Sequence, residues 1–117
     1  MLKIKQLMVD LYGCEADLND EDFLLATLES AAVEVGARVV KRIAQRFSPQ
    51  GVSAILLLAE THLSIHTWPE HGYAAVDIFI CGDGKDPHVA WGAIREFLKP
   101  ESFEINEIVR TIGERHA

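Results

Sequence analysis

Residues 48–59 read SPQGVSAILLLA, and this stretch sets the architecture that we expect for the whole chain. Residues 48–51 are a turn signal, because proline fixes one backbone angle and glycine permits angles closed to other residues. The segment before the turn, 39–47, partly alternates in polarity, and the segment after it, 52–59, is mostly apolar. Two extended segments joined by a turn predict a β-hairpin. The unbroken apolar run 54–59 further predicts a strand that is buried on both faces.

Two amphipathic helices are predicted outside this hairpin. Between residues 23 and 35 apolar residues recur at intervals of three and four; Asn19 and Asp20 precede them as capping residues, and Gly36 follows where a helix end needs a left-handed residue. Residues 87–98 form the second predicted helix, because they begin with a proline, which is favoured in a first helical turn. The apolar side chains expected to hold it on the sheet are Val89, Ala90, Ala93, Ile94, Phe97 and Leu98.

Four further segments have strand patterns, namely residues 2–12, 61–68, 74–80 and 103–112. Together with the hairpin they give the order strand, helix, four strands, helix, strand. Short links between the middle strands favour antiparallel pairing, so we expect an α+β fold: a two-layer sandwich of mainly antiparallel sheet with two helices on one face. A chain of 117 residues fits one domain, residues 1–117, with a modest core.

The charge of the chain argues against some classes of partner. The formal net charge is −7, with 11 lysines and arginines against 18 acidic residues, which disfavours binding to nucleic acid or to an anionic membrane surface. A small cationic ligand fits this surface better. No apolar run approaches the roughly 20 residues that span a bilayer, and Cys14 and Cys81 are too few for a disulfide framework. We therefore expect a cytoplasmic protein whose cysteines are reduced.

The segment 61–68 reads THLSIHTW and is dense in hydroxyl and imidazole groups, which cost free energy when they are buried without partners. A metal site is one interpretation, since His62 and His66 would share a face of a helix; on a strand they are about 13 Å apart, too far for one zinc ion. A serine hydrolase is another, although Ser53 and Ser64 lack the Gly-x-Ser-x-Gly setting. A third is a core strand with hydrogen-bonded hydroxyls and no catalytic role. Composition alone favours this third interpretation.

The order of residues favours a fourth interpretation. Residues 60–77 read ETHLSIHTWPEHGYAAVD, with DLYGC at 10–14 and QGVS at 50–53 before them and Cys81-Gly82 after them. This pattern, and its His-Thr-Trp-Pro-Glu core above all, resembles the small pyruvoyl-dependent S-adenosylmethionine decarboxylase proenzymes of bacteria and archaea. The resemblance extends over nearly the whole chain. It implies the fold of that family and a proenzyme that makes its own cofactor.

In that family a serine hydroxyl attacks the preceding carbonyl, the resulting ester undergoes β-elimination, and the chain is cut to leave an N-terminal pyruvoyl group. That carbonyl forms a Schiff base with the substrate amine and is the electron sink for the loss of carbon dioxide. The resemblance therefore implies a covalent pyruvoyl-type cofactor, with neither pyridoxal phosphate nor a metal. It further implies S-adenosylmethionine as the substrate and spermidine biosynthesis as the pathway.

The family motif implies roles for five residues in self-cleavage and catalysis. Thr61 matches the nucleophile and the future carbonyl, and Glu60 contributes the carbonyl that is attacked. His66 matches the base that removes the α-proton during elimination, and Ser53 matches a hydroxyl that assists processing. Cys81 matches the proton donor to the decarboxylated carbon. An imidazole that titrates near neutrality and a thiol suit these roles chemically.

Three further matches concern the substrate. Glu70 matches the carboxylate that holds the ribose hydroxyls, while Phe47 and Trp68 match aromatic positions near the adenine and the sulfonium. A sulfonium over aromatic rings is a cation–π arrangement, and the acidic surface agrees with it in sign. Members of the family form dimers with sites at or near the subunit contact, so the resemblance implies a homodimer or a larger homo-oligomer.

The chain departs from the family pattern at two places. Residues 4–6 read IKQ where a Gly-Arg-His-like sequence is common, and Thr61 stands where the family uses serine. The extra methyl group adds steric demand to the acyl shift, and processing would leave a 2-oxobutanoyl instead of a pyruvoyl group. Because about 1.4 kcal/mol of added barrier slows a step tenfold, we expect slow or absent maturation. An uncleaved binding or regulatory homologue and a decarboxylase of arginine or ornithine are the alternative functions.

Overall fold

The computed structural model describes residues 2–81 and 84–113, so Gly82 of the sequence motif lies outside the described residues. The elements are, in order, β1 (Leu2–Tyr12), α1 (Glu21–Val35), β2 (Val39–Arg46), β3 (Val52–Leu58), β4 (His62–Trp68), the 3-10 helix η1 (Pro69–His71), β5 (Tyr73–Cys81), α2 (Pro87–Leu98) and β6 (Ser102–Ile112). The predicted order of strand, helix, four strands, helix and strand is confirmed, and the boundaries agree to within a few residues.

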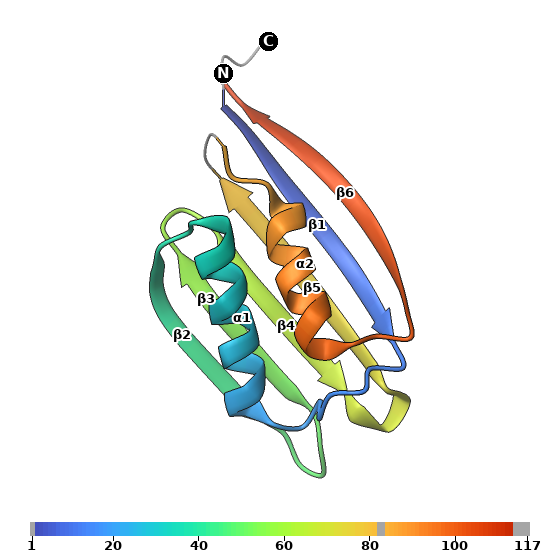
Figure 1. Ribbon diagram of the computed structural model, residues 1–117. Helices are drawn as coiled ribbons and strands as arrows, with labels where there is room; N and C mark the ends of the chain where they lie inside the picture. Colours follow the sequence, from blue (N-terminus) through green and yellow to red (C-terminus); the bar gives the residue numbers. More distant parts are fainter. Residues whose placement is uncertain (1, 82–83, 114–117) are drawn as a thin grey trace.

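The six strands form one sheet in the order β2-β3-β4-β5-β1-β6. Every neighbouring pair is antiparallel. Figure 1 shows α1 and α2 side by side across one face of the sheet, where α1 packs on β2, β3 and β4 and α2 packs on β5 and β1. The predicted α+β sandwich is therefore confirmed. We call the other side of the sheet the open face, because neither α1 nor α2 covers it.

The N-terminus of α1 is capped by one of the two residues predicted for that role. The Asp20 side chain accepts a hydrogen bond from the Phe23 amide at 3.0 Å, and Gly36 ends the helix in the left-handed conformation, with a φ of 77°. Asn19 is not the cap: its side chain accepts a hydrogen bond from the Gly51 amide at 2.9 Å. Asn19 thereby ties the loop before α1 to the turn between β2 and β3.

The buried side of α2 agrees with the predicted one at Ala90, Ile94 and Leu98 and differs from it elsewhere. It is formed by Pro87, Ala90, Trp91, Ile94 and Leu98. Val89 and Phe97, which we expected to hold the helix on the sheet, are exposed, and the buried Trp91 packs against Phe103 with ring centroids 5.1 Å apart. The large indole fills the space between helix and sheet that the prediction gave to smaller side chains. Neither described helix is long and apolar enough to cross a membrane.

The hydrophobic core lies between the helices and the sheet. In β3 the side chains of Val52, Ala54, Leu56 and Leu58 are buried, whereas Ile55 and Leu57 are 37% and 47% exposed. The prediction that this strand is buried on both faces is therefore wrong for the single chain. Its apolar residues occur on both sides of the pleat, but only one side meets the helices. The open face consequently presents apolar side chains to water.

Candidate functional site

The predicted site residues lie on two turns and on the strands that join them. The β2–β3 turn, residues 47–51, lies at the start of β3, and the β3–β4 turn, residues 59–61, lies at its end. Because β3 and β4 are antiparallel neighbours, β4 starts at the second turn and ends close to the first. The site residues therefore divide into two groups at opposite ends of the β3–β4 hairpin.

The first group surrounds a hollow of about 260 Å³ near the end of β4, which we call the His66 hollow. Its walls are formed by Phe47, Gln50, Gly51, Val52, Ser53, His66, Thr67, Trp68 and Glu70. The structure thus brings together five predicted site residues: Phe47, Ser53, His66, Trp68 and Glu70. Phe47 and Trp68 are 51% and 42% exposed, so their rings are available to a ligand and are not buried core side chains.

Ser53 and His66 face each other across the β3–β4 pairing. The Ser53 Oγ and His66 Nδ1 atoms are hydrogen-bonded at 2.7 Å. Both side chains lie on the open face, since they alternate with the buried Ala54 and Ile65. The hydrogen bond fixes the imidazole ring through one nitrogen and leaves the other nitrogen to exchange a proton with a third group. This is the geometry that a general acid or base requires.

A buried threonine holds the floor of the His66 hollow. The Thr67 hydroxyl accepts a hydrogen bond from the Val52 amide at 2.9 Å and donates one to the Leu18 carbonyl at 2.7 Å. Gly51 lies directly beside it with a φ of 111°, and a Cβ atom at that glycine would come within 3.2 Å of the Thr67 carbonyl oxygen. Thr67 therefore has a structural role, and the small residue beside it lets the turn approach β4.

Aromatic rings extend from the His66 hollow along the open face. Trp68 and Tyr73 have ring centroids 5.4 Å apart, and Tyr73 and Tyr12 have centroids 5.5 Å apart. The Tyr73 hydroxyl donates a hydrogen bond to Asp10. That hydrogen bond, partial burial and the negative charge of the carboxylate raise the pKa of Tyr73 to about 12. The sequence analysis did not assign a role to Tyr73, because strand pairing alone brings it beside Trp68.

The second group surrounds a smaller hollow of about 200 Å³ at the β3–β4 turn, which we call the Thr61 hollow. Its walls are formed by Gly36, Ala37, Arg38, Ala59, Glu60, Thr61, Ile80, Cys81 and Lys85. Thr61 is 6% exposed, and its carbonyl accepts a hydrogen bond from the Leu58 amide at 2.8 Å, which closes the turn. Glu60 has a φ of 82°, a left-handed conformation that is strained for a residue with a side chain.

The two hollows are separated by the length of β4. His62, the neighbour of Thr61, and His66 are four residues apart on an extended strand, which corresponds to about 13 Å. Within one chain the structure thus brings Glu60, Thr61 and Cys81 together, and Ser53 and His66 together, but it does not join the two groups. Cys14 lines neither hollow, and burial raises the pKa of its thiol.

Both histidines of the metal interpretation have other partners in the structure. His62 pairs with a carboxylate, its Nε2 atom lying 3.4 Å from Asp77 Oδ2, and His66 pairs with Ser53. In residues 2–81 and 84–113 no three histidine, cysteine, aspartate or glutamate side chains are grouped so that they could hold a metal ion. Asp77 itself was missed as a candidate. A single carboxylate in the apolar strand β5 was the signal, and only the strand register identifies its partners.

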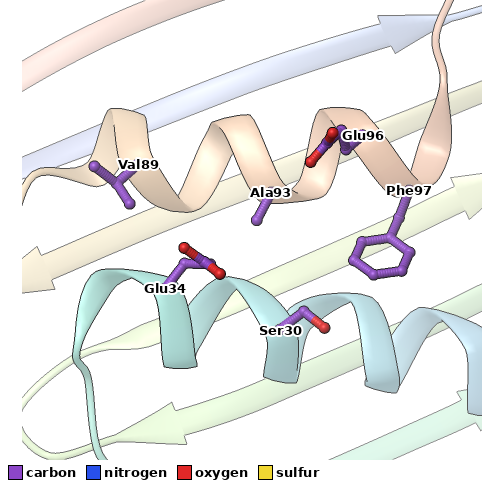
Figure 2. A pocket seen from close by; sticks show the side chains of 6 residues that line it. All are labelled: Ser30, Glu34, Val89, Ala93, Glu96 and Phe97. Carbon is purple, nitrogen blue, oxygen red and sulfur yellow. The ribbon is translucent and has the colours of Figure 1, made fainter.

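Two of the further hollows lie between α1 and α2 and on the open face beside His66. Figure 2 shows one, a groove of about 370 Å³ between α1 and α2, lined by Ser30, Glu34, Val89, Ala93, Glu96 and Phe97. None of these is a predicted site residue, and the groove is on the helical side of the sheet. The other, of about 390 Å³, adjoins His66 on the open face and is lined by Met8, Val9, Asp10, Ser64, His66, Ala75, Val76, Asp77 and Asn106. It extends the space around His66 toward two carboxylates.

Comparison with known proteins decides the family. The sequence profile described as S-adenosylmethionine decarboxylase matches residues 5–111. The chain belongs to the S-adenosylmethionine decarboxylase family. The S-adenosylmethionine decarboxylase proenzyme of Prochlorococcus marinus (strain MIT 9313) is 48% identical over 107 residues, which cover 91% of this chain and 86% of that protein. The proenzyme of Methanococcus aeolicus is 46% identical over 107 residues, covering 91% and 92%.

The fold of this S-adenosylmethionine decarboxylase family member agrees with that of a solved relative. The crystal structure of the adenosylmethionine decarboxylase from Aquifex aeolicus VF5 matches with a TM-score of 0.88 and 32% sequence identity, and the match covers 99% of this chain and 97% of that one. The resemblance drawn from residues 60–77 is confirmed as family membership. The individual roles of the matched residues, and the consequence of threonine at position 61, stay predictions.

Proposed function

We propose that this chain is a self-cleaving S-adenosylmethionine decarboxylase that is cut between Glu60 and Thr61 and supplies the aminopropyl donor for spermidine synthesis. The observation that carries the proposal is the composition of the Thr61 hollow. The predicted nucleophile, Thr61, and the predicted proton donor, Cys81, line one small hollow, although β4 and β5 separate them in the sequence. With Thr61 and Cys81 in one hollow, a chain of this family has both a residue that can form the carbonyl group and a residue that can donate a proton in the reaction at that carbonyl.

Self-cleavage begins with groups of the β3–β4 turn. The Thr61 hydroxyl attacks the Glu60 carbonyl carbon, the peptide C–N bond breaks, and an ester and a free Thr61 amine result. A base then removes the Thr61 Cα proton, and the Cβ–O bond breaks to release the Glu60 carboxylate. Tautomerisation and hydrolysis by one water release ammonia and leave a 2-oxobutanoyl group on His62. The left-handed backbone of Glu60 supports this chemistry, because cleavage relieves its strain.

The residues around position 61 fit a carbonyl group there. Thr61 is almost fully buried, so the reacting atoms are shielded from bulk water. A carbonyl group at this position would supply the acceptor for the electrons that the substrate releases when it loses carbon dioxide. Cys81, in the same hollow, holds a proton for the carbon that loses its carboxylate. The proposed role of Cys81 therefore needs only a short transfer within the Thr61 hollow.

The residues of the His66 hollow suit a cationic nucleoside. Phe47 and Trp68 offer exposed aromatic faces, which attract a sulfonium and stack on an adenine ring. Glu70 offers a carboxylate that can accept hydrogen bonds from both ribose hydroxyls. The net charge of −7 adds long-range attraction for a cation. These features favour S-adenosylmethionine over arginine or ornithine, which have no aromatic base to stack on Phe47 and Trp68.

A second copy of the chain would complete the proposed site. His66, the proposed base, lies about one strand length from Thr61 of its own chain and cannot reach it. The open face carries exposed apolar side chains, including Ile43, Ile55, Leu57 and Ile108, which a partner would cover. The base that acts at Thr61 of one copy would then be His66 of the other. These observations support the homodimer that the resemblance implies.

Mixing two inactive variants tests this shared site. Thr61→Ala removes the nucleophile and keeps His66, whereas His66→Ala keeps Thr61 and removes the base. If the site is shared, neither variant cleaves alone, and the His66→Ala chain is cleaved after the two are unfolded and refolded together. Mass spectrometry distinguishes the chains by their masses. Absence of cleavage in a mixed dimer of proven composition would contradict the shared site.

The proposed function is tested by mass and by product. Long incubation of the purified chain should give fragments of residues 1–60 and 61–117, the second with a carbonyl at its N-terminus, and carbon dioxide release from S-adenosylmethionine. The same assay with arginine and with ornithine separates the alternative decarboxylases. A chain that stays intact, even as Thr61→Ser, and still binds S-adenosylmethionine would support the binding or regulatory homologue.

A further inference from the structure

A row of three side chains links the residue after Thr61 to the middle of the sheet. The His62 Nε2 atom lies 3.4 Å from Asp77 Oδ2, and the Gln6 Nε2 atom donates a hydrogen bond to Asp77 Oδ1 at 2.9 Å. The His62 ring also packs edge-on against Phe79, with ring centroids 5.5 Å apart. The row spans the adjacent strands β4, β5 and β1 on the open face. None of the three lines the His66 hollow or the Thr61 hollow, although Asp77 also lines the hollow of about 390 Å³ beside His66.

The Gln6 amide has a fixed orientation in this row. An ionised carboxylate only accepts hydrogen bonds, so the amide must turn its nitrogen toward Asp77. The Gln6 Oε1 atom is then buried, and it has no hydrogen-bond partner among the described residues. Buried polar atoms without partners are uncommon in folded proteins. Because such an atom does not stabilise the fold, its presence needs another explanation. Gln6 is therefore suited to hold the Asp77 carboxylate in one place, where it meets His62.

Cleavage of the chain moves His62 from the interior of the chain to its new N-terminal end. Before cleavage, peptide bonds join Thr61 to Glu60 on one side and to His62 on the other. After cleavage between Glu60 and Thr61, His62 is the first intact residue of a new chain and carries the carbonyl group on its amide nitrogen. Terminal strand residues fray unless they are tied down. Besides the Leu58 amide, which donates a hydrogen bond to the Thr61 carbonyl, the contacts of the His62 side chain with Asp77 and Phe79 then hold the residue next to the reacting group.

We infer that His62 is a positioning residue: its contacts with Asp77, which Gln6 braces, keep the new N-terminal carbonyl in register after the turn is cut. The inference rests on the proposed function and deepens it. It assigns to His62 neither proton transfer nor substrate contact. Small displacements of a reacting atom have large effects, since a misplacement of about 1 Å can cost roughly 100-fold in rate. A side-chain pair of modest strength can therefore matter for turnover without mattering for folding.

The chain offers a matched control. His88 and Glu107 form another histidine–carboxylate pair, with His88 Nε2 2.6 Å from Glu107 Oε1, and they line neither the His66 nor the Thr61 hollow. The side chains of both pairs are partly exposed to a similar degree. An effect of His62→Ala that comes only from losing a surface histidine pair should therefore appear in His88→Ala as well.

The experiment uses the Thr61→Ser chain, in which cleavage is expected to be fast, and adds His62→Ala, His62→Gln or His88→Ala. Mass spectrometry gives the cleaved fraction, steady-state kinetics give kcat and KM, and amide hydrogen exchange reports on the segment 62–64. We expect His62→Ala to lower kcat by roughly 10- to 100-fold with little change in KM. In the cleaved His62→Ala chain the amides of residues 62–64 should exchange at least about tenfold faster than in the cleaved Thr61→Ser chain. In an uncleaved chain that carries both Thr61→Ala and His62→Ala they should not exchange faster. His62→Gln, whose amide can still donate to Asp77, should restore most of kcat.

Three results would overturn the inference. One is a His62→Ala chain whose kcat and exchange equal those of His88→Ala. Another is an equal rise in exchange before and after cleavage, which indicates a purely structural contact. If His62→Ala fails to fold, His62→Gln decides alone, and a loss of kcat as large as that of a non-pairing His62→Leu chain overturns the inference. Failure of the proposed function looks different, because then neither the parent nor Thr61→Ser is cut, and the inference falls with it.

Discussion

The two ends of the β3–β4 hairpin are built in opposite ways, although the same two strands run through both. At the Thr61 end the left-handed residue is Glu60, whose side chain makes that conformation costly. At the His66 end the positive φ belongs to Gly51, which adopts it without strain. The buried Thr67 at that end has both hydrogen-bond functions satisfied. One end thus stores strain beside the proposed nucleophile, Thr61, and the other is relaxed around an imidazole.

This difference separates the reactions that each end can serve. A strained peptide bond favours a reaction that breaks the chain once, and a fixed hydrogen-bonded imidazole favours repeated proton transfer. The Thr61 hollow is also the smaller and more buried one, as suits reacting atoms, whereas the His66 hollow exposes aromatic rings, as suits binding. The predictions below change one end at a time.

The largest effect is expected at position 61. Thr61→Ser removes the γ-methyl group that hinders the acyl shift and should speed cleavage by roughly 10- to 100-fold, since about 1.4 kcal/mol of barrier corresponds to tenfold in rate. Thr61→Ala should abolish cleavage. Intact mass measured over a time course checks both variants. Equal cleavage rates for the parent and Thr61→Ser would show that the methyl group is not the obstacle.

A large loss of stability, with no direct chemical effect, is expected for Thr67→Val at the other end. The change keeps the shape of the side chain but leaves the Val52 amide and the Leu18 carbonyl without their buried partner. Each group left unsatisfied costs about 1–3 kcal/mol, so the two together should lower the free energy of unfolding by about 2–6 kcal/mol. Urea unfolding measures it. Ser53→Ala is the matched control: it should leave stability nearly unchanged and slow cleavage, because Ser53 is partly exposed and bonded to His66.

The two turns should respond oppositely to exchange of their left-handed residues. Gly51→Ala forces a side chain onto a φ of 111° and against the Thr67 carbonyl, and should cost about 1–3 kcal/mol of unfolding free energy. Glu60→Gly relieves strain worth about 1–2 kcal/mol, but a more flexible unfolded chain takes back about 0.4–1 kcal/mol. Urea unfolding should therefore show a clear loss of stability for the first and a gain between about 0 and 1.6 kcal/mol for the second. A large loss for Glu60→Gly would mean that Glu60 has a contact worth more than its strain.

Much of the fold could be predicted from local signals. The Ser48-Pro49-Gln50-Gly51 turn, the capping Asp20 and the terminal Gly36 each act through neighbouring residues, so the hairpin and α1 were found where expected. Burial was harder to predict. The apolar run in β3 could not reveal that helices cover only one face, and the spacing in α2 did not distinguish Trp91 from Val89.

Candidate site residues could be named from the sequence, but the way in which they are grouped in space could not. Ser53, His66, Trp68 and Glu70 are recognisable because their order in the sequence is specific, and the strand register places them in one hollow. That the Thr61 hollow lies at the far end of β4 depends on which way each strand runs. Tyr73 and Asp77 were missed because their partners, Asp10 and Gln6, come from β1, the strand that pairs with β5 from the other side.

The smallest effect is expected from Asp10→Asn, which tests whether the charge of the Asp10 carboxylate holds the Tyr73 side chain beside the His66 hollow. In the parent the hydrogen bond to Asp10 raises the pKa of Tyr73 to about 12, above the usual value of 10.0. Because the folded-state pKa is the higher one, this stabilisation is complete below pH 10 and is lost as the pH rises toward 12. Tyr12→Phe leaves Tyr73 as the only tyrosine, so phenolate absorbance then reports on it alone.

In that background Asp10→Asn should move the Tyr73 titration down toward pH 10, because an amide oxygen accepts the phenol hydrogen bond more weakly than a carboxylate does and carries no charge to oppose the phenolate. Stability at neutral pH should fall only slightly, since the amide oxygen still accepts the hydrogen bond. The decrease in stability that the parent shows between pH 10 and 12 should then largely disappear. If Tyr73 titrates near pH 10 before Asp10 is changed, its ring is held beside Trp68 by strand pairing and packing alone.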